Sequence, residues 1–426
     1  MSTPTHPASP PVRLRGNRNF LLLWAGAGFT MLAARMSGIA LPLLVIWRTG
    51  SAWSAGLVGF AALLPNLLVQ LPAGALVDRW DRRRLMIYCD LGCLLATGSV
   101  AAAVLANRVW LPHLMLATFI QGSLAILYRL GERAGIRHLV PPEQLPAAIT
   151  GNEARTQASG LLGQPLGSVL FTVGRWLPMV GAAVAHAVSL VCLLAIGSKL
   201  QEERDPAPRR LFWREVTAGL TWIWQRPFLR AVMGLVGVSN LLFQAVSLAL
   251  IVIVHDSGGS PRVVGLITAA AGLGGVLGAL SSAWWLRRLS LRAVLILALL
   301  AWALLIAGLA NTHQPVLLGL DFAMISGIGG VSNTAGGVYQ MRVTPDALQG
   351  RVNSVLGLIG SGCSSVGVLL GGLALQSLGS QPAVLGVAAL MGVLALLGLA
   401  LPAEAPVHST QPAVTETRVA EDSSVQ

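Results

Sequence analysis

Apolar runs of about 20 residues recur along this chain from residue 19 to residue 402, and a helix of that length crosses the ~30 Å hydrocarbon core of a bilayer. Of all residues, 54% are hydrophobic and 11% are charged, against roughly a quarter charged in soluble proteins. The sequence therefore predicts an all-α polytopic membrane protein. We predict twelve transmembrane helices, near residues 19–47, 54–77, 85–106, 110–131, 147–172, 177–198, 229–254, 263–285, 291–311, 315–340, 349–376 and 382–402.

The distribution of Arg and Lys predicts the orientation, because cytoplasmic loops of membrane proteins are enriched in these residues. With the N-terminus in the cytoplasm, 23 of the 29 Arg and Lys residues lie on the cytoplasmic side and 4 on the other side. We therefore expect a multi-pass protein of the cell (inner) membrane with both termini cytoplasmic. This pattern also accounts for the net charge of +12, so we expect no nucleic-acid partner.

Changes in composition divide the chain into five segments. The central connection carries Trp and Arg residues in a pattern typical of a helix at the membrane interface, and the last segment is polar and Pro-containing, as in disordered tails. The segments are a cytoplasmic tail (1–18), a first six-helix half (19–198), a cytoplasmic linker with an interfacial helix (199–228), a second six-helix half (229–402) and a disordered cytoplasmic tail (403–426).

A dense charge cluster interrupts the apolar sequence after the second predicted helix. Six of the seven positions from Asp78 to Arg84 are charged, and a weaker copy of the segment that begins at Gly74 recurs near Gly278 to Leu289. Two further short matches occur in the same order in both halves: Gly50–Leu57 with Gly259–Leu266, and Val140–Leu145 with Val343–Leu348. Three matches in register indicate two parallel repeats of six helices.

The segment from Gly74 to Arg84 resembles the loop motif that joins the second and third helices of the major facilitator superfamily. Its flanking segments resemble the macrolide-efflux and enterobactin-exporter branch of that family. The resemblance covers residues 13–402 and implies two pseudo-symmetric six-helix halves that transport by alternating access. It also implies a conformational gate, in which Gly74, Asp78 and Arg79 act with a matching base, Arg351, at the start of the predicted helix 349–376. The alternative is a basic loop that only orients the protein.

Several positions depart from the motifs of that family. Asp81 stands where the loop motif has Gly, and Thr118 stands where its fourth helix has an Arg before Gln-Gly. Pro165 is displaced by one position in the antiporter motif of the fifth helix, and Ala34 replaces an acid that this branch often carries in the first helix. Antiport by the usual residues of the family is therefore not inherited directly.

Charged residues inside a membrane are costly and are functional candidates by default. Arg35 could bind an anionic substrate group or an acidic partner, or it could extend to the membrane interface without such a role. Glu153 and Arg155, near Glu132, could form a structural ion-pair network, or Glu153 could couple transport to protons. Asp321, in the tenth predicted helix, is a candidate for coupling or for substrate binding.

Uncharged polar residues supply further candidates. Asn240 and Gln244 are four residues apart and so share one helix face, where they could contact substrate or only neighbouring helices. We expect Asp90 to pair with the loop arginines and His186 to be a satisfied histidine between helices. The four cysteines lie in apolar segments without other soft ligands, so we predict no metal site.

These features favour a secondary active transporter. The chain has no Walker-type nucleotide loop, no cofactor is expected, and a proton gradient is the suspected source of energy. We predict an exporter of small amphipathic compounds such as antibiotics, siderophores or other secondary metabolites, acting as a monomer in the lipid bilayer. The alternatives are a lysophospholipid or lipid flippase of the same fold and a non-transporting membrane receptor or scaffold. No nucleophile–base constellation indicates an enzyme.

Overall fold

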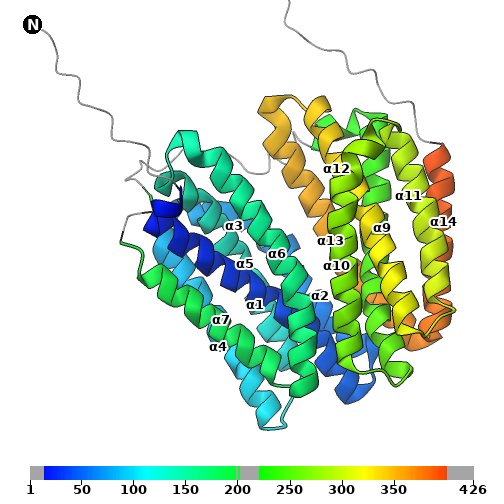
Figure 1. Ribbon diagram of the computed structural model, residues 1–426, viewed down its shortest axis with the longest axis horizontal. Coiled ribbons are helices and arrows are strands. Elements are labelled where there is room, and N and C mark those ends of the chain that lie inside the picture. Colours follow the sequence, from blue (N-terminus) through cyan, green and yellow to red (C-terminus); the bar gives the residue numbers. More distant parts are fainter. Residues whose placement is uncertain (1–13, 198–199, 202–219, 401–426) are drawn as a thin grey trace, which may run out of the picture.

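The computed structural model describes residues 14–197, 200–201 and 220–400, and this part of the chain contains helices and no β-strand. The helices form two groups that lie side by side (Figure 1). The first group contains α1 (Arg18–Thr49), α2 (Ala52–Leu68), α3 (Gln70–Arg79), α4 (Arg82–Leu105), α5 (Leu111–Leu139), α6 (Leu145–Val173) and α7 (Leu177–Leu194). The second contains α9 (Pro227–Asp256), α10 (Pro261–Leu286), α11 (Leu291–Leu309), α12 (Pro315–Val343), α13 (Asp346–Leu378) and α14 (Ser380–Leu399).

Ten of these helices are long and apolar enough to cross a membrane. The other predicted spans correspond to α6, whose first half is polar, and to α2 with α3, which we expected to be one continuous helix over 54–77. The helix is interrupted at Val69. Pro72 has no N–H to donate to the carbonyl of Leu68, and its ring disfavours a regular helix through that turn. The described helices thus occupy all twelve predicted positions, one of them in two pieces.

Local signals explain where several helices begin and end. Asn17 accepts a hydrogen bond from the backbone N–H of Phe20 (3.1 Å) and Asp81 accepts one from Arg84 (2.8 Å), so each caps a helix N-terminus. Gly50 ends α1 with φ of 64°, in the left-handed region that glycine adopts without steric cost.

The structure describes only part of the predicted linker, since residues 202–219 lie outside the described residues. Residues 220–224 are helical, and the Arg226 guanidinium carbon lies 3.8 Å from the ring centroid of Trp222. The tails, 1–13 and 401–426, also lie outside the described part.

Glycines lie where neighbouring helices approach each other most closely. A Cβ at Gly274 or Gly278 on α10 would overlap the backbone of Ala323 or Gly327 on α12. The same holds for Gly367 on α13, which lies against the backbone of α9 at residue 241. Small residues at this spacing let membrane helices approach closely.

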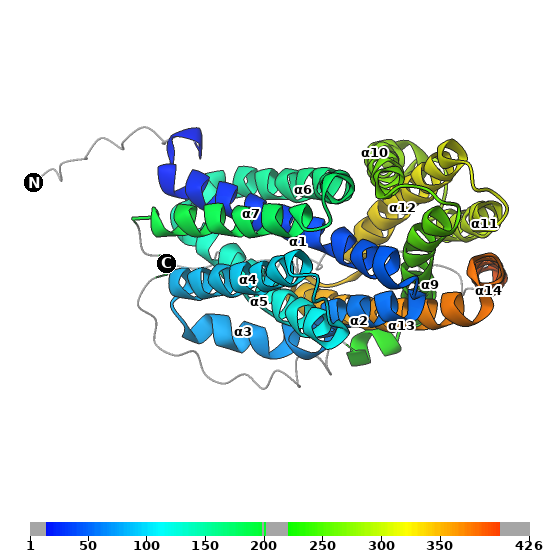
Figure 2. The ribbon, with the colours of Figure 1, turned by 90° about the horizontal axis from the view of Figure 1, so that it is seen from below.

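Contacts between the two groups lie toward one end. We name the end where α1 begins and α12 ends the proximal end, and the opposite end, where α1 and α13 end, the distal end. Near the distal end Gly56 of α2 lies against Gly372 of α13 and Gly265 of α10 lies against Ser168 of α6. Toward the proximal end the two groups diverge (Figure 1), and Figure 2 shows α1 and α2 reaching α9 and α13 at their distal parts.

Candidate functional site

The interior face of the first half is most clearly defined on α6. This helix packs against α1 on one side and α10 on another. In the second half of α6 the large exposed apolar residues gather on a third side: Leu162, Leu166, Val169 and Val173. At 3.6 residues per turn, the side opposite to these carries Glu153, Gln157 and Gln164. Glu153 and Gln157 are exposed, and the Gln157 amide donates a hydrogen bond to Glu153 Oε1 (3.0 Å).

Two arginines reach the same interior region from α1 and α5. Arg35 on α1 is exposed, and the stem of its side chain covers Gly163 of α6, where an added Cβ would overlap it. Arg129 on α5 is exposed on the side opposite to the apolar Leu116 and Ile120. Arg133, Arg35 and Glu132 all lie within electrostatic reach of Arg129. Sequence reasoning named Arg35 but not its relation to Arg129.

The second half carries side-chain amides on α9 and α12. Asn333 and Gln340 on α12 lie opposite the exposed apolar residues of that helix, and the Gln340 amide donates to Asn353 Oδ1 of α13 (2.9 Å). Asn240 on α9 lies beside Gly360 of α13. Gln244, one turn further, is half-buried. Asn240 therefore lies on the seam between α9 and α13.

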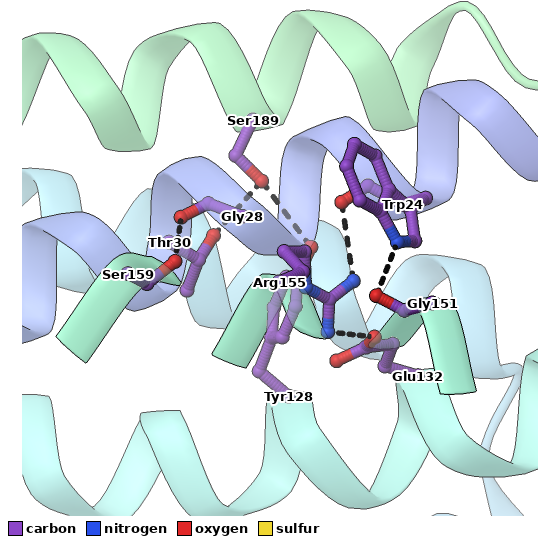
Figure 3. Close-up of polar contacts among 9 residues, drawn as sticks. All are labelled: Trp24, Gly28, Thr30, Tyr128, Glu132, Gly151, Arg155, Ser159 and Ser189. Carbon is purple, nitrogen blue, oxygen red and sulfur yellow. Dashed lines mark hydrogen bonds and ion pairs between the residues drawn. The ribbon is translucent and has the colours of Figure 1, made fainter. Parts of the chain in front are cut away.

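Arg155 and Glu153 have different surroundings although they are neighbours in sequence. Arg155 is buried, and its Nη2 donates to Glu132 Oε1 at 2.6 Å, with side-chain exposures of 9% and 8%. Its Nη1 donates to the carbonyl of Trp24 (3.1 Å), and the Trp24 indole donates to the carbonyl of Gly151 (3.2 Å), as Figure 3 shows. Arg155 therefore joins α1, α5 and α6 within the first half, and Glu153 is left on the interior face.

A second buried network centres on Asp90 of α4, which is fully buried. Its Oδ1 accepts a hydrogen bond from Thr30 of α1 (2.9 Å) and lies 3.1 Å from His186 Nδ1 of α7. Its Oδ2 accepts one from Ser189 (2.5 Å). The Tyr128 hydroxyl lies 3.2 Å from the Ser189 hydroxyl, and Figure 3 shows these two with Thr30. We expected Asp90 to pair with loop arginines; the structure pairs it with His186 instead, which is satisfied between helices as predicted.

Asp321 lies apart from the interior face. Its Oδ2 would be 3.6 Å from a Cβ at Gly308, so the carboxylate points toward α11. The half-buried position places it between α12 and α11, and the structure does not bring it near Glu153 or Arg35.

The residues of the implied gate lie near the proximal end. Gly74 is half-buried with open space beside it, Arg79 is exposed, and Arg351 is half-buried in the first turns of α13. The side chain of Asp78 lies outside the described residues.

The neighbouring arginines do more than orient the chain. Arg82 Nη1 donates to the carbonyls of Ala134 and Leu200 (both 3.3 Å). Arg83 donates to the carbonyls of Leu193 (3.1 Å) and Leu194 (2.8 Å) at the end of α7. Carbonyls at a helix C-terminus have no partner within the helix. The basic loop therefore ties the start of α4 to α5 and α7.

An apolar groove of about 310 Å³ lies between α10 and α12, lined among others by Val263, Leu266, Val316 and Leu320. Its residues come from the distal parts of both helices, away from the polar interior face. Such a lining suits lipid chains rather than a polar compound.

Two groups of apolar helices joined near one end are the arrangement typical of a membrane transporter of the major facilitator type. The chain belongs to the transmembrane secretion effector family of that superfamily, whose model matches residues 9–422. It is 28% identical to the multidrug efflux pump Tap of Mycolicibacterium fortuitum over 401 residues, which cover 90% of this chain and 94% of that protein. It is 26% identical to macrolide efflux protein A of Streptococcus pyogenes over 388 residues, 84% of this chain and 90% of that protein.

Solved structures show the same fold. The nucleoside transporter NupG matches with a TM-score of 0.69 at 14% identity, over 90% of this chain and 98% of that one. A bacterial homologue of the human lysosomal transporter Spinster, in an inward-facing and unoccupied conformation, matches with a TM-score of 0.68 at 14% identity, over 92% and 97%. These matches confirm the predicted fold.

Proposed function

We propose that this protein exports small amphipathic compounds across the cell (inner) membrane by alternating access, as a monomer driven by the proton gradient. The observation that carries the proposal is the one-ended joining of the two halves, with Gly56 against Gly372 and Gly265 against Ser168 near the distal end. The efflux activities named for two relatives, Tap and macrolide efflux protein A, support the direction of transport.

The charge distribution supports the orientation. The arginine-rich loop at residues 79–84 lies at the proximal end, which the positive-inside rule assigns to the cytoplasm. The interior faces then open toward the cytoplasm, and compounds would enter from there. Rocking of one half against the other would expose the same faces to the outside. We propose Gly74, Asp78, Arg79 and Arg351 as the gate that holds the proximal ends together in that second state.

Glu153 is our candidate for proton coupling. It is a carboxylate on the interior face, and its described hydrogen bond comes from a neutral amide, Gln157. A group of this kind can gain and lose a proton as the path opens to either side. Asp321 is a weaker candidate because it points toward α11.

The test uses proteoliposomes with the protein in one orientation and an imposed pH gradient, with ethidium and fluorescein as probes. Uphill movement of at least one probe, abolished by an uncoupler, is the expected result. Glu153→Gln should abolish uphill movement while leaving downhill exchange. Glu143→Gln, an exposed glutamate in the turn before α6, is the matched control and should be unchanged.

Other outcomes would overturn parts of the proposal. Uphill transport that persists in Glu153→Gln would remove this residue as the coupling site. Translocation of a fluorescent lysophosphatidylglycerol with no movement of either dye would favour the lipid flippase. Absence of any movement would favour a receptor or scaffold.

A further inference from the structure

We infer that the interior face of the first half is a binding site for an organic anion, formed by Arg35 of α1 and Arg129 of α5. The cargo class is therefore an amphipathic compound that carries a carboxylate or sulfonate. This inference rests on the proposed function, because it assigns the chemistry of the compound that enters the path.

The side chains of Arg35 and Arg129 are both accessible. Both are exposed although they belong to helices of the bundle. Among the described residues, no carboxylate lies within ion-pair distance of either guanidinium. Arginine inside a membrane protein otherwise pairs with an acid or with backbone carbonyls, as Arg155 and Arg83 do here. Arg35 and Arg129 keep their donors available.

Arg35 and Arg129 both contribute to a positively charged region of the first half. The positive charges of Arg133 and Arg35 both act on Arg129, and so does the carboxylate of Glu132, which is itself paired with Arg155. Two like charges held together in one accessible region raise the local potential and attract an anion. Guanidinium groups also offer planar pairs of N–H donors that match a carboxylate or sulfonate.

The two halves of the protein carry different polar groups. Glu153 is the acid on the α6 face, and its carboxylate already accepts the Gln157 amide. On the second half Asn333 of α12 is exposed, while Gln340 is hydrogen-bonded to Asn353 and Asn240 lies beside Gly360 of α13. A compound with its anionic group toward the first half and a neutral hydrogen-bonding group toward the second would match both sides.

The experiment compares two dyes that share the xanthene ring system and differ in charge. Binding of fluorescein, an anion at mildly alkaline pH, and of rhodamine 123, a cation, is measured by fluorescence anisotropy on the full-length protein in detergent. No transport step is involved, so failure here is distinguishable from failure of export. We expect fluorescein to bind at least about tenfold more tightly than rhodamine 123, the ratio that one charge interaction of ~1.4 kcal/mol produces.

Variants locate the site. Arg35→Gln and Arg129→Gln should each weaken fluorescein binding by about tenfold and leave rhodamine 123 binding unchanged. Arg35→Lys keeps the charge and should retain the preference for the anion, which separates charge from folding. Arg262→Gln, at an exposed arginine in the first turn of α10 near the distal end, is the matched control and should bind like the unmodified protein.

Two results would overturn the inference. One is equal or tighter binding of rhodamine 123 to the unmodified protein. The other is unchanged fluorescein binding in both Gln variants. Competition assigns the source of the anion: displacement of fluorescein by 2-naphthoate supports a small compound, and displacement by lysophosphatidylglycerol alone overturns that assignment in favour of a lipid phosphate.

Discussion

At the scale of single residues, the polar groups of the first half separate into those that hold helices together and those that stay accessible. Arg155 and Glu132 form a close, buried ion pair, and Asp90 is contacted by polar groups from two other helices, α1 and α7. Arg35 and Glu153 face the interior path. Removing a buried partner should affect stability, and removing an accessible group should affect binding or coupling.

Glu132→Gln should lower the free energy of unfolding by about 3–5 kcal/mol, because it leaves the buried Arg155 guanidinium without its counter-charge. The thermal midpoint in detergent, followed with a thiol-reactive dye, measures this effect. The double variant Glu132→Leu with Arg155→Met should recover most of the loss, since neither charge is then buried. Arg137→Met, at an exposed position in the last turn of α5, should leave the midpoint unchanged. A stable single variant would refute a structural role for the pair.

The contacts between polar side chains on different helices were the hardest feature to predict from the sequence. Composition and local spacing indicated which polar residues lie inside the membrane, and they correctly placed Arg155 near Glu132. They could not pair Asp90 with His186, which is 96 positions away on another helix. That contact depends on how α4 and α7 pack against each other, and a single sequence carries no direct signal of this packing.

At the scale of helices, the sequence was far more informative. Length and hydropathy predicted ten of the spans, because the bilayer imposes both, and the other two predicted positions are helical as well. The prediction failed at Val69, where one span divides into α2 and α3. Pro65 and Pro72 were visible in the sequence, but prolines inside membrane helices are often accommodated without a break, as Pro42 is in α1.

Gly278→Val should prevent stable folding or cost at least the ~1–3 kcal/mol typical of overpacking. The reason is that its Cβ would meet the backbone of Gly327 on α12, which cannot rotate away as a side chain can. Yield of monodisperse protein and thermal midpoint are the measurements. Gly392→Val on α14, where nothing lies within 4 Å, is the control for the substitution itself. Equal behaviour of the two variants would show that the α10–α12 seam tolerates separation.

At the scale of the whole molecule, the distal contacts form the seal of the conformation described here. Ser51, before α2, donates a hydrogen bond to Gln376 Oε1 of α13 (3.1 Å). The alternating access that we propose requires this contact to open when the proximal ends close. The two positions therefore report on the conformational cycle.

A short thiol-to-thiol cross-link between Ser51→Cys and Gln376→Cys should stop transport, because it holds the distal ends together. The four native cysteines are first replaced, since two of them are only partly buried. Transport of the dye that moves uphill in the unmodified protein is measured before and after a reducible cross-linker, and reduction should restore it. Ser51→Cys alone, treated in the same way, is the control. Full transport in the cross-linked protein would mean that the distal ends do not separate during the cycle.

The placement of Arg35 and Arg129 also bears on energetics. A bacterial membrane potential is negative inside, and moving one elementary charge through 100 mV is worth about 2.3 kcal/mol. An anion leaving the cytoplasm moves down this electrical gradient, whereas a cation leaving it moves against the gradient. A path lined by two guanidiniums would therefore favour anionic cargo, whose exit the membrane potential assists. The pH gradient would then have to supply less of the energy for export.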